Sequence, residues 1–260
     1  MRKPLIAANW KMNKTIGEAL TFAGTFGQKL FERFEGGHIP VDVLICPPFL
    51  GIPALCAVFA GKPVYIGAQN MYWEDKGAFT GEVSAPMLKH TGCSFVIVGH
   101  SERRQLFGET DEHVAKKARA ALDHGLKPVI CVRETLEQRE QGNTHKVVSE
   151  QIRAAFSQIK PEEVPSVVVA YEPVWAIGTG KEAKPEDAAD VIRGIRETVD
   201  TMLGQGVSEE LRVLYGGSVK PANIRSFMLE EQIDGALVGG ASLDPEDFFK
   251  LVETAHKTKG

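Results

Sequence analysis

Glu172 is the residue of this sequence whose surroundings most clearly indicate chemistry. It follows an apolar, β-branched run, Val167–Ala170, and precedes Pro173, which has no N–H group for a strand ladder and ends the predicted strand. A short apolar loop with two glycines follows over residues 174–181. A carboxylate at a strand end, beside a hinged loop that excludes water, is suited to act as a general base. The alternative is a surface carboxylate on an ordinary strand-to-helix loop.

His100 is a second candidate. It follows an apolar run, and Ser101-Glu102 after it is typical of the start of a helix. The positive end of a helix dipole disfavours imidazolium, so we expect a neutral ring. A neutral imidazole can donate a hydrogen bond to a carbonyl oxygen and then transfer a proton. The alternative is a histidine that is hydrogen-bonded for structural reasons alone.

Asn9 and Lys11 stand two residues apart at the end of the first apolar run. An amide and an ammonium at this spacing could bind an anionic substrate. The neighbouring Trp10 and Met12 predict that the turn packs against the protein and holds the lysine still. The alternative is an Asx-type turn followed by a solvated lysine.

Two glycine-rich turns, at residues 216–218 and 239–241, favour binding of a phosphate group. Backbone N–H groups and the N-terminus of a short helix can hold a dianion with few cationic side chains. Gly178 could add another N–H group. The string Gly178–Lys181 superficially resembles a nucleotide P-loop, but residue 175 is Trp rather than Gly, and Glu182 follows the lysine.

Eight short apolar runs, about 30 residues apart, must position these groups. They are continuously apolar, as expected of parallel strands that are covered on both faces. Helical patterns lie between them, at 111–124, 185–203, 221–229 and 245–254 among others. We therefore predict a single closed (β/α)8 barrel over residues 1–260. The eight runs are Leu5–Trp10, Val41–Cys46, Val64–Ala68, Phe95–Val98, Pro128–Val132, Val167–Tyr171, Arg212–Tyr215 and Gly235–Val238.

An open, doubly wound α/β sheet is the alternative fold. It usually has fewer strand–helix units and a glycine-rich phosphate turn after its first strand, whereas residues 8–13 contain no glycine. In a closed parallel barrel, all strands open their carboxyl ends on one face. The base, the imidazole, the ammonium, the amide and both glycine-rich turns should therefore meet at one mouth.

Composition limits the remaining possibilities. The chain has 260 residues, a net charge of −4 and 43% hydrophobic residues, which argues against a broad nucleic-acid surface. No apolar run approaches the roughly 20 residues that span a bilayer, and the N-terminus does not resemble a signal peptide. The four scattered cysteines, Cys46, Cys56, Cys93 and Cys131, lack metal-binding spacing. Three of them lie in apolar runs, where we expect buried free thiols, and we predict no metal and a cytoplasmic protein.

The chain resembles the triosephosphate isomerase family over essentially its whole length. The resemblance implies the TIM-barrel fold and the interconversion of dihydroxyacetone phosphate and glyceraldehyde 3-phosphate without a cofactor. It also implies a role in glycolysis and gluconeogenesis. Seven segments carry it, in order: Ala8–Asn13, Gly67–Asn70, Gly77–Glu82, Gly99–Arg104, Ala170–Gly180, Tyr215–Val219 and Gly239–Ala241.

The resemblance also implies residue roles. Glu172 would be the base, His100 the neutral electrophile, and Lys11 and Asn9 the groups that stabilise negative charge, with Glu102 behind them. The loop 173–184 would act as a lid that Tyr215 latches. The phosphate would be held by Gly178, Ser218, Gly239 and Gly240.

The sequence also predicts a partner subunit, and it differs from the usual family pattern at two positions. The apolar excursion at residues 69–84 would either pack on itself or, as the resemblance implies, insert into a second subunit to give a homodimer, with Thr80 near the partner's site. Arg133 stands where the family commonly has Gly, and we expect a local or surface effect there. Glu182 is unusual in the lid.

Three alternative functions stay open. They are another phospho-sugar isomerase, an aldolase, which would need a lysine that forms a Schiff base, and a barrel that binds sugar phosphates without catalysis.

Overall fold

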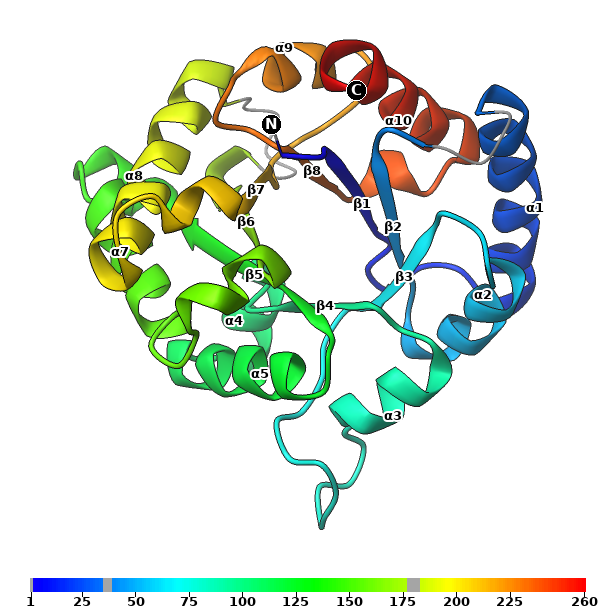
Figure 1. Cartoon of the computed structure of the whole chain (residues 1–260), viewed down its shortest axis with the longest axis horizontal. Helices are drawn as coiled ribbons and strands as arrows, with labels where there is room; N and C mark the ends of the chain where they lie inside the picture. Colours follow the sequence, from blue (N-terminus) through cyan, green and yellow to red (C-terminus); the bar gives the residue numbers. More distant parts are fainter. Residues whose placement is uncertain (1, 35–38, 177–182) are drawn as a thin grey trace.

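The chain forms a closed barrel of eight parallel strands, with helices around the outside (Figure 1). The computed structural model describes residues 2–34, 39–176 and 183–260. β1 pairs with β2 on one side and with β8 on the other, from Leu5 opposite Gly235 to Ala8 opposite Val238, which closes the ring. The predicted fold class is therefore confirmed. The strands are β1 (Leu5–Asn9), β2 (Asp42–Cys46), β3 (Tyr65–Ala68), β4 (Phe95–Val98), β5 (Lys127–Glu134), β6 (Val168–Pro173), β7 (Arg212–Tyr215) and β8 (Gly235–Val238).

Helices lie between the strands, and several of them start at side-chain caps. Thr15 caps the first long helix and forms a capping box with Glu18, and Thr110 does the same with His113. The helices are α1 (Ile16–Arg33), α2 (Ile52–Val58), α3 (Ala85–Thr91), α4 (Ser101–Phe107), α5 (Asp111–Asp123), α6 (Leu136–Glu140), α7 (Thr144–Ala155), α8 (Pro185–Leu203), α9 (Ile224–Leu229) and α10 (Pro245–Lys259).

The strands are buried on both faces, which explains their continuous apolar sequences. One face of each strand packs on the surrounding helices in the larger cluster of buried residues. The other face fills the barrel interior and alternates with the first along each strand. On β5 the inward positions are Val129 and Cys131, and on β6 they are Val168 and Ala170. The interior cluster consists of Leu5, Ala7, Leu44, Cys46, Phe95, Ile97, Val129, Cys131, Val168, Ala170, Leu214 and Leu237.

Several element ends differ from the sequence predictions, and β5 continues two residues beyond the predicted Val132, to Glu134. β6 continues through Glu172 to Pro173, which pairs with Glu134 as the last residue of the strand, where a missing N–H costs least. α9 begins at Ile224 rather than at residue 221, because residues 221–223 form a turn. α10 continues to Lys259, beyond the predicted end at residue 254.

The loop between β3 and α3, residues 69–84, projects from the barrel (Figure 1). Tyr72 stacks on Trp73 with ring centroids 4.0 Å apart and lies 4.5 Å from Phe79, and Met71 is fully buried. The self-packing alternative is therefore correct for part of the loop, while Phe79 stays 40% exposed at the tip. Within the described ranges, we find no helix that is long and apolar enough to cross a membrane.

Candidate active site

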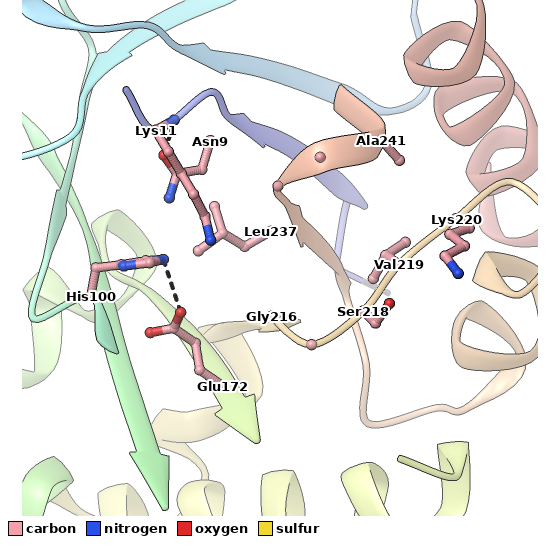
Figure 2. A pocket seen from close by; sticks show the side chains of 13 residues that line it. Asn9, Lys11, His100, Glu172, Gly216, Ser218, Val219, Lys220, Leu237 and Ala241 are labelled. Atoms are coloured by element: carbon pink, nitrogen blue, oxygen red, sulfur yellow. Dashed lines mark hydrogen bonds and ion pairs between the residues drawn. The ribbon is translucent and has the colours of Figure 1, made fainter. Parts of the chain in front are cut away.

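A cavity of about 280 Å³ opens at the carboxyl ends of the strands. Figure 2 shows His100 and Glu172 on one side, Asn9 and Lys11 on another, and the glycine-rich turns opposite. The structure therefore brings the predicted site residues together, except Gly178, which lies outside the described residues. The lining residues are Asn9, Lys11, His100, Glu172, Gly216, Gly217, Ser218, Val219, Lys220, Leu237, Gly239, Gly240 and Ala241.

Glu172 lies near the end of β6 and is only 1% exposed. Its Oε2 accepts the Ser101 amide N–H at 2.9 Å, and its Oε1 accepts the Ser101 hydroxyl at 3.1 Å. The Nε2 of His100 lies 3.0 Å from Oε1. Burial raises the pKa of Glu172, but His100 and both Ser101 donors outweigh it, so the pKa is lowered overall. The carboxylate is thus ionised and held at the cavity wall.

His100 caps the N-terminus of α4, as predicted. Its Nδ1 accepts the Glu102 amide N–H at 3.2 Å, so Nε2 carries the ring proton and donates it toward Glu172. Burial lowers the pKa of His100, whereas the Glu172 and Glu102 carboxylates raise it, and the net direction is upward. The amide at Nδ1 still requires an unprotonated Nδ1, because an imidazolium has no acceptor. The hydrogen bond therefore fits the neutral tautomer, and moving Glu172 away would remove the main cause that raises the pKa.

Lys11 is held in place by several contacts. Its Nζ lies 2.6 Å from the Glu102 Oε1, and its backbone has a positive φ of 53°. Asn9 Oδ1 accepts the Lys11 amide N–H at 3.1 Å, which is the predicted Asx-type contact, yet both side chains also line the cavity. The Gln69 amide donates to the carbonyls of Lys11 and Cys46, each at 2.9 Å. The lysine is therefore an oriented cation.

The residues beside this turn behave differently from one another. Trp10 is fully buried, and its Nε1 donates to the carbonyl of Ser242 at 3.1 Å, which ties the turn to the end of β8. Met12 is 96% exposed, so the expectation that it packs within this chain is wrong. The chain turns at Lys11, and Met12 leaves the barrel surface there.

The turn after β7 is shaped by close contacts that only glycine allows. A Cβ on Gly216 would lie 3.0 Å from the Cγ of Glu172, and one on Gly217 would lie 2.1 Å from the Tyr215 hydroxyl oxygen. The backbone can therefore run close to the Glu172 side chain. Ser218 follows at the cavity wall.

The turn after β8 brings the lysine and a helix start together. A Cβ on Gly239 would lie 3.4 Å from the Cε of Lys11, so the lysine side chain lies beside this turn. Gly240 begins a short 3₁₀ helix, Gly240–Ser242, and the space where its side chain would be is open. Backbone N–H groups at a helix start beside a cation can bind an anion.

The sequence model of the triosephosphate isomerase family matches residues 4–255. The chain belongs to the triosephosphate isomerase family. A protein named triosephosphate isomerase from Caldanaerobacter subterraneus subsp. tengcongensis is 52% identical, over 97% of this chain and 99% of that protein. Those from Chloroflexus aurantiacus and Dictyoglomus turgidum are 49% and 46% identical, over 97% and 98% of this chain and 99% and 100% of their own. The resemblance inferred from seven segments is confirmed.

Two residues beside Glu172, Ser101 and Arg133, were not predicted from the sequence to lie there. Ser101 was interpreted only as a helix start, but its amide and hydroxyl both hold Glu172. Arg133 was expected to act locally or at the surface, but it lies opposite Glu172 on the neighbouring strand. Its position could have been predicted, because Val129, Cys131 and Arg133 alternate onto one face of β5.

Half of the expected lid at 173–184, residues 177–182, lies outside the described residues. At the start of the expected lid, the Trp175 Nε1 donates to Glu134 Oε1 at 2.8 Å, and the Tyr171 hydroxyl on β6 donates to the same oxygen at 2.8 Å. Within the described ranges we find no group of three or more His, Cys, Asp or Glu side chains that could hold a metal ion. Of the cysteines, Cys46, Cys93 and Cys131 are buried, and Cys56 is partly exposed.

Proposed function

We propose that this protein is a triose-phosphate isomerase that interconverts dihydroxyacetone phosphate and D-glyceraldehyde 3-phosphate through an enediolate, with residues 1–260 acting as one catalytic domain. One observation carries the proposal. A buried carboxylate and an imidazole, Glu172 and His100, face a lysine and two glycine-rich turns across one cavity of about 280 Å³. That cavity suits a small substrate with a carbonyl at one end and a phosphate at the other.

The reaction moves two protons and needs no external reactant. The Glu172 carboxylate leaves Ser101 and removes a proton from the carbon that bears the hydroxyl group. The electron pair moves onto the carbonyl oxygen, toward which the Nε2–H of His100 donates. His100 transfers the hydroxyl proton between the two oxygens, and Glu172 returns its proton to the neighbouring carbon. Asn9 and Lys11 stabilise the oxyanion and the phosphate as charge develops.

The phosphate would lie between the two glycine-rich turns. Gly239, Gly240 and Ser218 offer backbone or hydroxyl donors there, and Gly178 would add an N–H from the lid. Holding the phosphate aligns the distant carbon with the base, which is the main contribution that binding makes to the rate. Closing the lid would protect the enediolate from loss of phosphate.

A homodimer through the 69–84 loop belongs to this proposal. A second groove of about 270 Å³ adjoins the cavity, and the exposed Met12 and the aromatic rings of Phe49 and Phe107 line it. The loop tip with Phe79 and Thr80 of a second copy would cover this apolar rim. Light scattering should show a species of twice 28.4 kDa. A monomer at micromolar concentration would contradict the interface. The Phe79→Asp variant should contain more monomer than the wild-type protein at the same concentration.

A coupled assay of glyceraldehyde 3-phosphate turnover tests the function, with Glu172→Asp and a metal chelator in parallel. We expect fast turnover that the chelator leaves unchanged and that falls sharply in the variant, because the shorter side chain withdraws the base from the substrate carbon. If the wild-type protein showed no turnover, the site would instead fit isomerisation of another phospho-sugar, or sugar-phosphate binding without catalysis. An isomerase of this kind would act in glycolysis and gluconeogenesis, in the cytoplasm.

A further inference from the structure

Arg133 occupies the position beside the proposed base. β5 and β6 pair in parallel, and their register places Arg133 directly opposite Glu172. Paired residues of neighbouring strands are about 4.8 Å apart in the hydrogen-bonding direction. Both residues continue the inward-facing positions of their strands, after Cys131 and Ala170. Their side chains therefore leave the sheet side by side, toward the mouth of the barrel.

The backbone of Arg133 is fixed from the outside. Its N–H donates to the Gln151 Oε1 at 2.9 Å, and its carbonyl accepts the Gln151 Nε2 at 2.8 Å. The side chain is partly buried, and its Nη1 is buried without a hydrogen-bond partner among the residues that the structure describes. A guanidinium placed in this way keeps its charge, and the charge acts on its neighbours through space.

The other charged groups around Glu172 are already engaged. Lys11 on β1 pairs with Glu102 on α4, and Arg104 on α4 pairs with Asp111 on α5 at 2.5 Å. Arg104 also donates to the carbonyls of Gly99 and Cys131. His100 contacts the carboxylate directly, and the Cys131 thiol on β5 lies beside it. Arg133 differs from Lys11 and Arg104 in having no carboxylate partner of its own among the described side chains.

We infer that Arg133 is a positioning residue for Glu172, whose positive charge favours the ionised carboxylate and so keeps the base ready down to lower pH. The direction of one pKa shift agrees with this geometry. Burial and the nearby Arg104 lower the pKa of Arg133, while Glu172 and Asp111 oppose that change, so the guanidinium and the base do interact. His100 and Ser101 are the main causes of the lowered pKa of Glu172, and the charge of Arg133 would act in the same direction. The consequence for catalysis rests on the proposed function, whereas the electrostatic effect does not.

The test is a direct titration of the Glu172 carboxyl group in the unliganded protein, by carbon-13 NMR of labelled glutamate with Glu172→Gln to assign the signal. An opposite charge within about 4–6 Å lowers a carboxyl pKa by about 1–3 units, and partial exposure reduces this effect. We expect Arg133→Gln to raise the pKa of Glu172 by about 0.5–1 unit. Arg133→Lys should restore at least half of the shift, because it keeps the charge.

Lys127→Gln is the matched control. Lys127 lies on the same face of the same strand at its opposite end, about 20 Å away at about 3.3 Å per residue, so its loss should leave the titration of Glu172 unchanged. A shift smaller than about 0.2 unit in Arg133→Gln, or an equal shift in Lys127→Gln, would overturn the inference. Arg133→Met, which matches the apolar stem, distinguishes lost charge from lost packing and should behave like Arg133→Gln.

Kinetics provides the second readout. In Arg133→Gln the acid limb of the kcat/KM profile should move to higher pH, because this profile reports the pKa of the base in the free enzyme. The plateau value of kcat should stay within about twofold of wild type, because the base itself is intact. A uniform fall of kcat at every pH would indicate a merely structural role and would contradict the inference. If the wild-type protein had no isomerase activity, the proposed function would fail, but the NMR titration would still decide the role of Arg133.

Discussion

Removing the Lys11 ammonium is the perturbation whose consequences the structure allows us to estimate most fully. Lys11 and Glu102 form a pair at 2.6 Å in which the side chains are 31% and 43% exposed. A pair this exposed contributes at most about 1 kcal/mol to stability, so Lys11→Met should fold. The substitution should instead lower kcat/KM, since the lysine lies beside the Gly239 turn where the phosphate would bind.

The size of the effect follows from two charges. An ammonium about 4 Å from one phosphate charge contributes about 4 kcal/mol at an effective dielectric constant of about 20, which is close to three powers of ten in kcat/KM. Without the lysine, Glu102 faces the phosphate unneutralised. At about 6–7 Å, and allowing for its exposure, that repulsion is about 1–1.5 kcal/mol, or roughly tenfold. We therefore expect Lys11→Met to lose about 10³–10⁴ in kcat/KM.

A double-mutant cycle with Glu102→Gln separates the lost attraction of Lys11 from the repulsion by Glu102. The double variant should recover roughly tenfold relative to Lys11→Met, while Glu102→Gln alone should change kcat/KM by less than about tenfold. Turnover is followed by NADH consumption in a coupled assay, and inhibition by inorganic phosphate reports on the anion site separately. If the double variant were no better than Lys11→Met, or if phosphate inhibited all four proteins equally, the assignment of Lys11 to the phosphate would be wrong.

Three further perturbations address the scaffold. Gly217→Ala places a Cβ 2.1 Å from the Tyr215 hydroxyl oxygen and should destabilise the protein by about 1–3 kcal/mol, as measured by chemical unfolding. Arg196→Met removes a guanidinium 2.6 Å from the buried Asp234 at the opposite end of the barrel, and it should lower Tm by about 10 °C with kcat nearly unchanged. Cys56, whose pKa is lowered by a hydrogen bond with Cys93 against the opposing effect of burial, should be the single fast-reacting thiol of the native protein.

Each of these perturbations has a control. Gly24→Ala lies in open space on the exposed face of α1 and should stabilise the protein by about 0.5–1 kcal/mol. A stable Gly217→Ala would show that the turn can relax. A large loss of kcat in Arg196→Met would argue that the two ends of the barrel are coupled. Rapid labelling that persists in Cys56→Ser would assign the reactive thiol to another position.

The strands were predictable because burial on both faces makes them continuously apolar, and the site was predictable because parallel strands open on one face. The contacts between those strand ends could not be predicted from the sequence. Ser101 and Glu172 are 71 positions apart, and only the curvature of the closed sheet brings them together. Met12 was misjudged because an apolar residue next to a buried Trp10 need not share its environment when the backbone turns at Lys11.

Arg133 illustrates a different limit. Strand alternation assigns it to the interior face, but sequence comparison alone treats it as a departure at one position of a turn. Whether an inward arginine matters depends on which residue of the next strand lies opposite, and that register is a property of the assembled barrel. The same uncertainty applies to Gln69, whose amide bridges the carbonyls of Lys11 and Cys46.

The pairing of β1 with β8 has a consequence for synthesis on the ribosome. Asn9 and Lys11 are made well before Gly239 and Gly240, and both groups line the cavity. Contacts between chain ends so far apart form late in folding. A nascent chain therefore contains the base and the imidazole well before it contains a complete phosphate site. Activity should arise all at once, after residue 240 leaves the exit tunnel, and a chain truncated before β8 should have none.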